Sequence, residues 1–194
     1  MTTKPYTQIA IFVLLALLML STRYAHFAQL PDASWAVFFA GGFYFRGRGG
    51  LAVFAALMLE AVAIDAAVIH YLGVSNFCVT AAYPFLVPTH GALWLAGAWT
   101  RRHYRWDASS ALQFALAAVI AVHLAYAISN ASFYWLGGRY AQPNVGEYLQ
   151  RFVRYYPHFM EVTLGYLAIL GVLHLAAASQ LPQLRPAGAA PRSA

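Results

Sequence analysis

The chain is built from long apolar runs joined by short polar connections, and this pattern restricts its fold more than any other feature. Residues 51–72 and 108–136 are each long enough to cross a bilayer, which requires about 20 apolar residues. Only 9% of the 194 residues are charged, whereas about 25% are charged in soluble domains. The sequence therefore predicts an integral membrane protein and excludes a soluble globular domain or a disordered chain.

Six helices are expected from the apolar runs and from the glycines and prolines that separate them. They are residues 9–20, 35–45, 51–72, 79–99, 108–136 and 148–178, with the first run continuing toward residue 28. No small-residue cleavage site follows the first run, so we expect a helix there, not a signal peptide. Pro157 is expected to interrupt the last helix. The predicted fold is all-α, a polytopic bundle of six transmembrane helices in one domain, residues 1–178, followed by a disordered tail, residues 179–194.

The basic residues predict the orientation of this bundle. With six crossings, Lys4, Arg46, Arg48, Arg101, Arg102, Arg105, Arg185 and Arg192 share one side, and Arg23, Arg139, Arg151 and Arg154 share the other. The excess of Lys and Arg marks the cytoplasmic side, so both termini are expected in the cytoplasm. The net charge of +6 does not indicate nucleic acid, because these residues lie between apolar runs and form no basic stripe with exposed aromatics.

Two carboxylates lie within one expected span. Glu60 and Asp65 belong to residues 51–72, and five residues on a helix separate them by about 140° around its axis. Ionisable groups inside a membrane are costly and often functional, as in proton-coupled transport. A polar clamp between two helices is the alternative interpretation of either residue.

Five histidines lie in or near the expected spans: His70, His90, His123, His158 and His174. Paired histidines could hold haem or a metal, which gives an alternative function, a haem- or quinone-binding electron-transfer subunit. No two of them stand four residues apart on one helix. Hydrogen bonding between helices is the simpler interpretation of each.

Cys78 is the only cysteine, which excludes an intramolecular disulfide and a cysteine-based zinc site. It follows the turn at residues 73–77, and Tyr83-Pro84 and Pro88 come shortly after it. Two prolines four residues apart open a helix, so the following helix is expected to line a cavity. If Cys78 begins that helix, the helix dipole lowers the pKa of its thiol and favours a nucleophile or a soft-metal ligand. An inert thiol is the alternative.

Basic and aromatic residues gather around the expected loop at residues 137–146. The basic residues are Arg139, Arg151 and Arg154, and the aromatic ones include Tyr134, Trp135, Tyr140, Tyr148, Tyr155 and Tyr156. Such groups suit a large, partly apolar ligand. Contact with phospholipid headgroups is the alternative.

This plan of six short-looped helices with an outward-facing site resembles the substrate-binding S-components of energy-coupling-factor (ECF) vitamin transporters. Cys78 in Ser75-Asn76-Phe77-Cys78, ahead of Tyr83-Pro84, most resembles the BtuM family of solitary S-components for cobalamin (vitamin B12). The resemblance extends from about residue 6 to residue 178. It implies a multi-pass protein of the bacterial inner membrane that binds cobalamin from outside and transports it inward.

The resemblance also implies roles for single residues. Cys78 would be the axial ligand of the corrin cobalt, and its thiolate could promote release of cyanide from cyanocobalamin, so that an enzymatic step is a hypothesis beside transport. For a corrinoid bound there, the side of the membrane and the side-chain chemistry, not the resemblance, make Asp65, Tyr83 and Arg151 the candidates for contacts with the corrin edge and its amide groups.

The sequence departs from the family pattern at the surface where S-components bind their partner. S-components dock on a shared ECF module through an Ala-x-x-x-Ala patch on the first helix, whereas here Leu14 follows Ala10 and Leu20 follows Ala16. We therefore expect the chain to transport alone or with an unknown partner in place of that module. The chain contains no G-x-x-x-x-G-K-[ST] motif, so ATP hydrolysis would have to be external.

Overall fold

The computed structural model describes residues 5–24 and 30–186, of which 82% are helical, with no strand among them. The α-helices are α1 (Pro5–Tyr24), α2 (Ser34–Tyr44), α3 (Gly47–Leu72), α4 (Leu86–His103), α5 (Ala108–Leu136) and α6 (Val145–Gln180). Two short 3-10 helices, η1 (Tyr83–Phe85) and η2 (Pro182–Leu184), precede α4 and follow α6. The all-helical fold predicted from the apolar runs is confirmed for this part of the chain.

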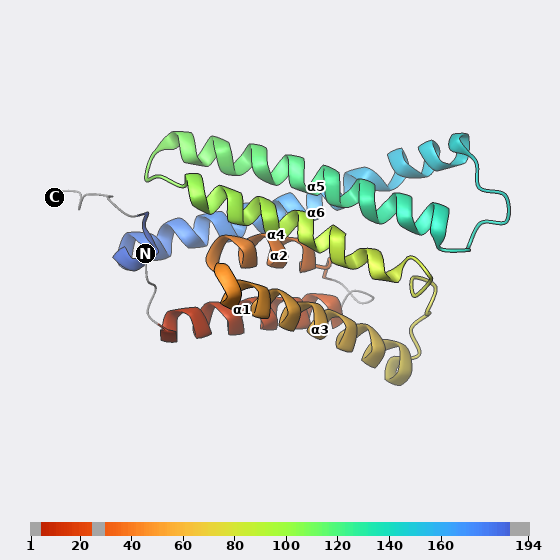
Figure 1. The fold of residues 1–194 in the computed structure, drawn as a ribbon, viewed down its shortest axis with the longest axis horizontal. Coiled ribbons are helices and arrows are strands. Elements are labelled where there is room, and N and C mark those ends of the chain that lie inside the picture. The colour runs from red at the N-terminus through yellow and green to blue at the C-terminus, as the bar shows by residue number, and fades with distance from the viewer. Residues whose placement is uncertain (1–4, 25–29, 187–194) are drawn as a thin grey trace.

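The long helices run along one axis, so the molecule has two ends (Figure 1). The terminal end holds the start of α1, the connections α2–α3 and α4–α5, and the end of α6. The loop end holds the connections α3–α4, residues 73–85, and α5–α6, residues 137–144. This alternation brings Arg46, Arg48, Arg101, Arg102, Arg105 and Arg185 to the terminal end, and Arg139, Arg151 and Arg154 to the loop end.

Among the described residues, four helices are long and apolar enough to cross a membrane: α1, α3, α5 and α6. The second helix, α2, has 11 residues and extends only about 16 Å at 1.5 Å per residue, which is about half of a bilayer core. Helix α4 has 18 residues but ends in Arg101, Arg102 and His103. The structure therefore supports a membrane-type helical bundle with four clear span candidates.

The short helix α2 forms the centre of the core. All its residues from Ser34 to Phe43 are buried. Its glycines allow α4 to approach very closely, because a Cβ on Gly42 would lie 1.9 Å from the Trp94 carbonyl oxygen and one on Gly97 would lie 1.9 Å from that of Phe39. Small residues at such a crossing let two backbones pack in contact. Helices α2 and α4 thus form a rigid unit around which the longer helices pack.

Three local expectations differ from the structure. Helix α4 begins at Leu86 and not at residue 79, because Pro84 lies in η1 and Pro88 lies in the first turn, where no backbone donor is needed. Helix α6 continues through Pro157. The segment expected to be a tail from residue 179 is helical to Gln180 and then forms η2, where Leu184 is buried. Residues 25–28 and 187–194, which carry the remaining expectations for the first helix and the tail, lie outside the described residues.

Candidate functional site

A cavity of about 380 Å³ lies at the loop end, between the ends of α1 and α3, the η1 segment, and helices α5 and α6. Its lining contains all four residues singled out from the sequence: Asp65, Cys78, Tyr83 and Arg151. They come from three separate parts of the chain. The fold therefore brings together the residues that the sequence predicts for one site, whatever its ligand.

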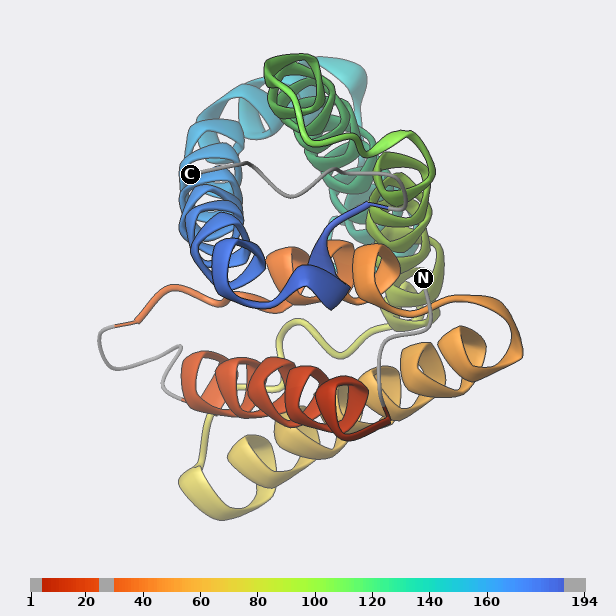
Figure 2. The same ribbon diagram turned by 90° about the vertical axis from the view of Figure 1, so that its left-hand side faces the viewer.

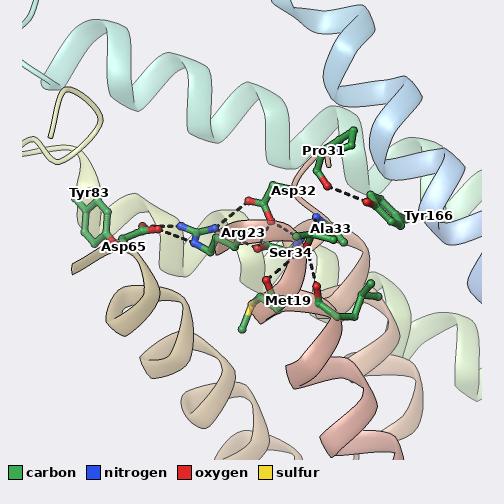
Figure 3. A network of polar contacts seen from close by, with 11 residues as sticks. Met19, Arg23, Pro31, Asp32, Ala33, Ser34, Asp65, Tyr83 and Tyr166 are labelled. Carbon is green, nitrogen blue, oxygen red and sulfur yellow. Dashed lines mark hydrogen bonds and ion pairs between the residues drawn. The ribbon is translucent and has the colours of Figure 1, made fainter. Parts of the chain in front are cut away.

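An ion-pair network forms one wall of this cavity (Figure 3). Arg23 of α1 donates two hydrogen bonds to Asp65 of α3, from Nε to Oδ1 at 2.7 Å and from Nη2 to Oδ2 at 2.6 Å. Its Nη1 donates to Oδ2 of Asp32 at 3.0 Å and to Oγ of Ser34 at 3.1 Å. Such a bidentate pair is both strong and directional. The network clamps α1, α3 and the start of α2 together.

Tyr83 belongs to the same network. Its hydroxyl donates to Oδ2 of Asp65 at 2.7 Å. Desolvation, together with the Asp65 carboxylate, raises the pKa of the Tyr83 phenol, so it stays a neutral donor. Both oxygens of Asp65 thus already accept hydrogen bonds from the protein. Of the two interpretations given for Asp65, the structure shows the polar clamp, and its network holds η1 and the adjacent cysteine segment in place.

Cys78 is exposed in the turn that precedes η1, at the rim of the cavity. The expectation that it starts a helix is wrong, because α4 begins only at Leu86. No helix dipole therefore acts on its thiol. Partial desolvation and the Asp65 carboxylate raise the pKa of Cys78, against opposing contributions from Arg139 and Arg23. At neutral pH the thiol is protonated, and a metal ion that binds it must displace the proton.

Arg139 ties the cysteine segment to the α5–α6 connection. Its guanidinium donates to the carbonyl oxygens of Phe77 at 3.1 Å and Asn76 at 3.3 Å, and lies 4.9 Å from the centre of the Phe77 ring. The Phe77 ring also packs on Phe133 of α5. The rim that carries Cys78 is therefore held from two sides, by Arg139 and by the Asp65 network.

Arg151 enters the cavity from α6 and differs from Arg23 in its partners. Its guanidinium lies 4.8 Å from the Tyr140 ring centre and 5.3 Å from that of Tyr155. Within residues 5–24 and 30–186 it forms no ion pair and no hydrogen bond. Stacking on two tyrosines orients its planar fork of donors while leaving them available for a ligand.

Asn130 is a cavity residue that the sequence analysis missed. Its Nδ2 donates to the Tyr126 hydroxyl at 3.3 Å, while its Oδ1 is buried without a partner. A buried acceptor without a donor is unfavourable, so this atom suits a ligand that brings an N–H or O–H group. An asparagine inside a predicted span was the signal that could have identified it.

Other candidates from the sequence lie elsewhere. Glu60 is partly exposed on α3 and does not line the cavity. The histidines have separate neighbours: His90 stacks on Phe38, His123 contacts Tyr156, and His174 contacts Tyr44 and Tyr104. Among the residues with described positions, no cluster of three or more His, Cys, Asp or Glu side chains could hold a metal ion.

No protein-family model matches the chain, and no curated protein matches it.

Proposed function

We propose that this protein binds cobalamin from the outer side of a bacterial inner membrane and transports it inward. Its six helices form the membrane domain, in which α2 extends over only about half of the bilayer core, and the terminal end and both termini lie in the cytoplasm. Support comes from the excess of arginines at the terminal end, which is typical of a cytoplasmic face. The cavity at the loop end then faces outward.

The observation that carries this proposal is the convergence of Cys78, Asp65, Tyr83 and Arg151 on one cavity. A corrin already supplies four nitrogen ligands to cobalt, so the protein needs to offer only one axial donor. A single soft thiolate at the rim is enough, and no multi-residue metal motif is needed.

The dimensions of the cavity indicate how a corrinoid would lie. A corrinoid is larger than the cavity of about 380 Å³, so only part of it can enter. Because Cys78 is exposed at the rim, the corrin ring would cover the cavity mouth with its lower face toward the thiolate. Arg151 would donate to amide oxygens of the corrin side chains, and Asn130 Oδ1 would accept from an amide N–H.

The same contact supplies a chemical step for cyanocobalamin. Cys78 binds cobalt from below through its sulfur, replaces the nucleotide base, and gives up its proton. Electron donation through cobalt weakens the upper bond, and cyanide leaves with its electron pair and takes up that proton as hydrogen cyanide. Cobalt stays in the +3 state, so no reductant is needed. Asp65 and Tyr83 act as positioning residues in this step, since they hold the segment that carries Cys78.

We further propose that transport does not depend on the shared ECF module. Leu14 and Leu20 stand where a small-residue docking patch would need alanines, and both are exposed on α1, by 66% and 44%. Bulky side chains at these positions oppose the close helix approach that small residues permit.

The test compares visible spectra of wild type and Cys78→Ala, each purified in detergent with cyanocobalamin present. We expect corrinoid bands shifted from those of free cyanocobalamin in wild type, bands that are unshifted or absent in Cys78→Ala, and cyanide released only by wild type. Cys78→Ser is the matched control for size, and it should behave like Cys78→Ala because its hydroxyl is a poor ligand for this metal.

The melting temperatures and the spectra together distinguish loss of binding from loss of folding. Because Cys78 is exposed, the variants should melt at the wild-type temperature, which excludes misfolding as the cause of lost binding. Absence of corrinoid from wild type would refute cobalamin binding. A haem Soret band in all three proteins would instead favour the electron-transfer function, for which the separate positions of the histidines give no support.

A further inference from the structure

A second, larger cavity lies at the terminal end, between α2, α5 and α6. Its volume is about 530 Å³, and its walls are largely apolar, with Phe114, Leu167, Leu170 and Leu175 among them. Figure 2 views the molecule from this end, with α5, α6 and α2 surrounding the region. We call it the terminal groove. No step of the proposed cobalamin function uses it.

The polar end of the terminal groove is a tyrosine–histidine cluster. The Tyr44 hydroxyl lies 2.7 Å from Nδ1 of His174, and the Tyr104 hydroxyl lies 3.1 Å from Nε2. All three side chains line the groove. In a neutral histidine one ring nitrogen carries a hydrogen and the other accepts one. The three groups thus hold three polar hydrogens for two hydrogen bonds, and in either tautomer one tyrosine O–H remains to donate to a ligand in the groove.

The charges around the terminal groove favour an anion. Arg105 lines it with an exposed side chain. Arg101 lies over the Phe43 and Tyr104 rings of its wall, and Arg185 lies over Trp106. The one acidic residue in the lining, Asp107, caps α5, where it accepts from Ser109 Oγ and from the Ser110 backbone N–H, and these bonds lower the pKa of its carboxyl. The Asp107 carboxylate is therefore bound to the start of α5, and the net charge around the groove comes from the arginines.

We propose that the terminal groove is a binding site for an anionic phospholipid. One acyl chain lies between α5 and α6 against Phe114 and Leu170. The ester or phosphate oxygens accept the spare O–H of the tyrosine–histidine cluster, and the phosphate faces Arg105. An apolar channel with one donor and a cationic rim matches such a lipid better than a free apolar molecule or a zwitterionic lipid.

The test uses detergent-purified full-length protein and native mass spectrometry. Phosphatidylglycerol and phosphatidylcholine with the same acyl chains are added separately, and the retained lipid is counted. We expect wild type to retain phosphatidylglycerol preferentially. Arg105→Gln should reduce this preference by about fivefold, the effect of one basic residue on an anionic lipid. Arg48→Gln, an exposed arginine at the same end that does not line the groove, should leave it unchanged.

A second pair of variants locates the acyl chain. Gly171 lines the groove, and a Cβ there would be in ordinary contact with Phe114 at 3.7 Å, so Gly171→Leu places its side chain in the groove from a backbone position that accepts a Cβ. We expect it to lower retention of both lipids by about tenfold, because it displaces several methylene groups of the chain. Gly165→Leu is the matched control on the same helix, since a Cβ there meets nothing within 4 Å.

Equal retention of both lipids by wild type would refute an anionic lipid site. Unchanged retention in Gly171→Leu would refute the location, provided that its melting temperature equals that of Gly165→Leu. If Gly171→Leu fails to fold, Arg105→Gln still tests the proposal. The Arg105 side chain is exposed, so this substitution should leave the fold intact. Cobalamin spectra of both Gly variants should match wild type, so that failure here is distinguishable from failure of the proposed function.

Discussion

The two cavities of this protein are built from different chemistry, although the same two helices, α5 and α6, line both. The loop-end cavity contains an ion-pair network, a thiol at its rim and an arginine without an acidic partner. The terminal groove is apolar along its length and ends in a tyrosine–histidine cluster. The wall of the loop-end cavity contains oppositely charged side chains in ion pairs. The terminal groove has charged side chains only at its rim.

This difference separates a site with defined donor positions from a site that accepts a flexible chain. Fixed ion pairs at the loop end hold Tyr83 and the cysteine segment, which a metal ligand requires, because its donor must be pre-positioned. An acyl chain needs only apolar surface and one or two polar anchors. The comparison predicts that polar substitutions act strongly at the loop end and weakly at the terminal end.

The largest effect is expected from Arg23→Met. This change leaves Asp65 and Asp32 without their partner, with side chains only 21% and 25% exposed. Removal of one member of a buried pair typically costs about 3–5 kcal/mol. We expect a loss of that size in the free energy of unfolding, measured by denaturant titration in micelles.

The double variant Arg23→Met/Asp65→Asn provides the control for this change. It removes one uncompensated carboxylate and should recover part of the lost free energy of unfolding. Arg154→Met changes an exposed arginine at the same end and should alter the free energy of unfolding little. If Arg23→Met were as stable as Arg154→Met, the network would not be what holds the loop-end cavity.

This network also marks where sequence reasoning stops. The helix expected at residues 108–136 agrees with α5 at both ends, and the structure shows Asp107 as the cap at its start. The sequence also selects Asp65, Cys78, Tyr83 and Arg151 for one site. It does not predict that Arg23 pairs with Asp65, because the two residues are 42 positions apart and any basic residue of the same side could take that place.

The local errors arise from proline and from the turn that holds Cys78. Pro84 and Pro88 stand in an apolar stretch that is typical of a helix, yet residues 79–85 form turns and η1 before α4 begins. This places the thiol away from a helix dipole and reverses the expected direction of its pKa. In α6, the helix is continuous at Pro157, where local propensity predicts an interruption.

The next effect concerns pH at the loop end. Desolvation and Asp65 raise the pKa of Cys78, so below that pKa cobalt must displace one proton to bind sulfur. For a corrinoid with water in place of cyanide as its upper ligand, this proton goes to the solvent, and the apparent affinity should therefore rise by about tenfold per pH unit until the raised pKa is reached. Titration of the shifted visible band between pH 6 and pH 10 measures this slope and the pH at which it levels off.

Asp65→Asn tests the cause of that slope. Loss of the carboxylate removes one contribution that raises the pKa of Cys78. The slope should therefore level off at a lower pH than in wild type. An affinity independent of pH in wild type would mean that no thiol proton is displaced, and the cobalt–sulfur contact would have to be abandoned.

A smaller effect is expected from Arg151→Gln. The variant keeps a hydrogen-bond donor but loses the charge and the planar fork that stacks on Tyr140 and Tyr155. Corrinoid affinity should fall by about tenfold, as for loss of one hydrogen bond from a charged donor, while the band position stays that of a thiolate complex. Arg154→Gln, one turn along α6 and outside the cavity lining, should leave affinity unchanged. Equal losses in both variants would point to general charge attraction.

The smallest effect is expected from Tyr44→Phe, which tests whether the two cavities are independent. It removes the hydroxyl that bonds Nδ1 of His174 and should cost about 1 kcal/mol of stability, the usual contribution of one hydrogen bond. His174 and Arg151 lie about 35 Å apart along α6 at 1.5 Å per residue, and sites so far apart normally contribute additively. Corrinoid affinity and band position should therefore equal those of wild type, and Tyr44→Phe/Arg151→Gln should show the summed effects.

A change in corrinoid affinity larger than twofold in Tyr44→Phe alone would instead show that the helices couple the terminal groove to the loop-end cavity. The ring contacts of Tyr44 within the described residues, with Phe43 and His174, lie at the terminal end and do not reach the loop-end cavity.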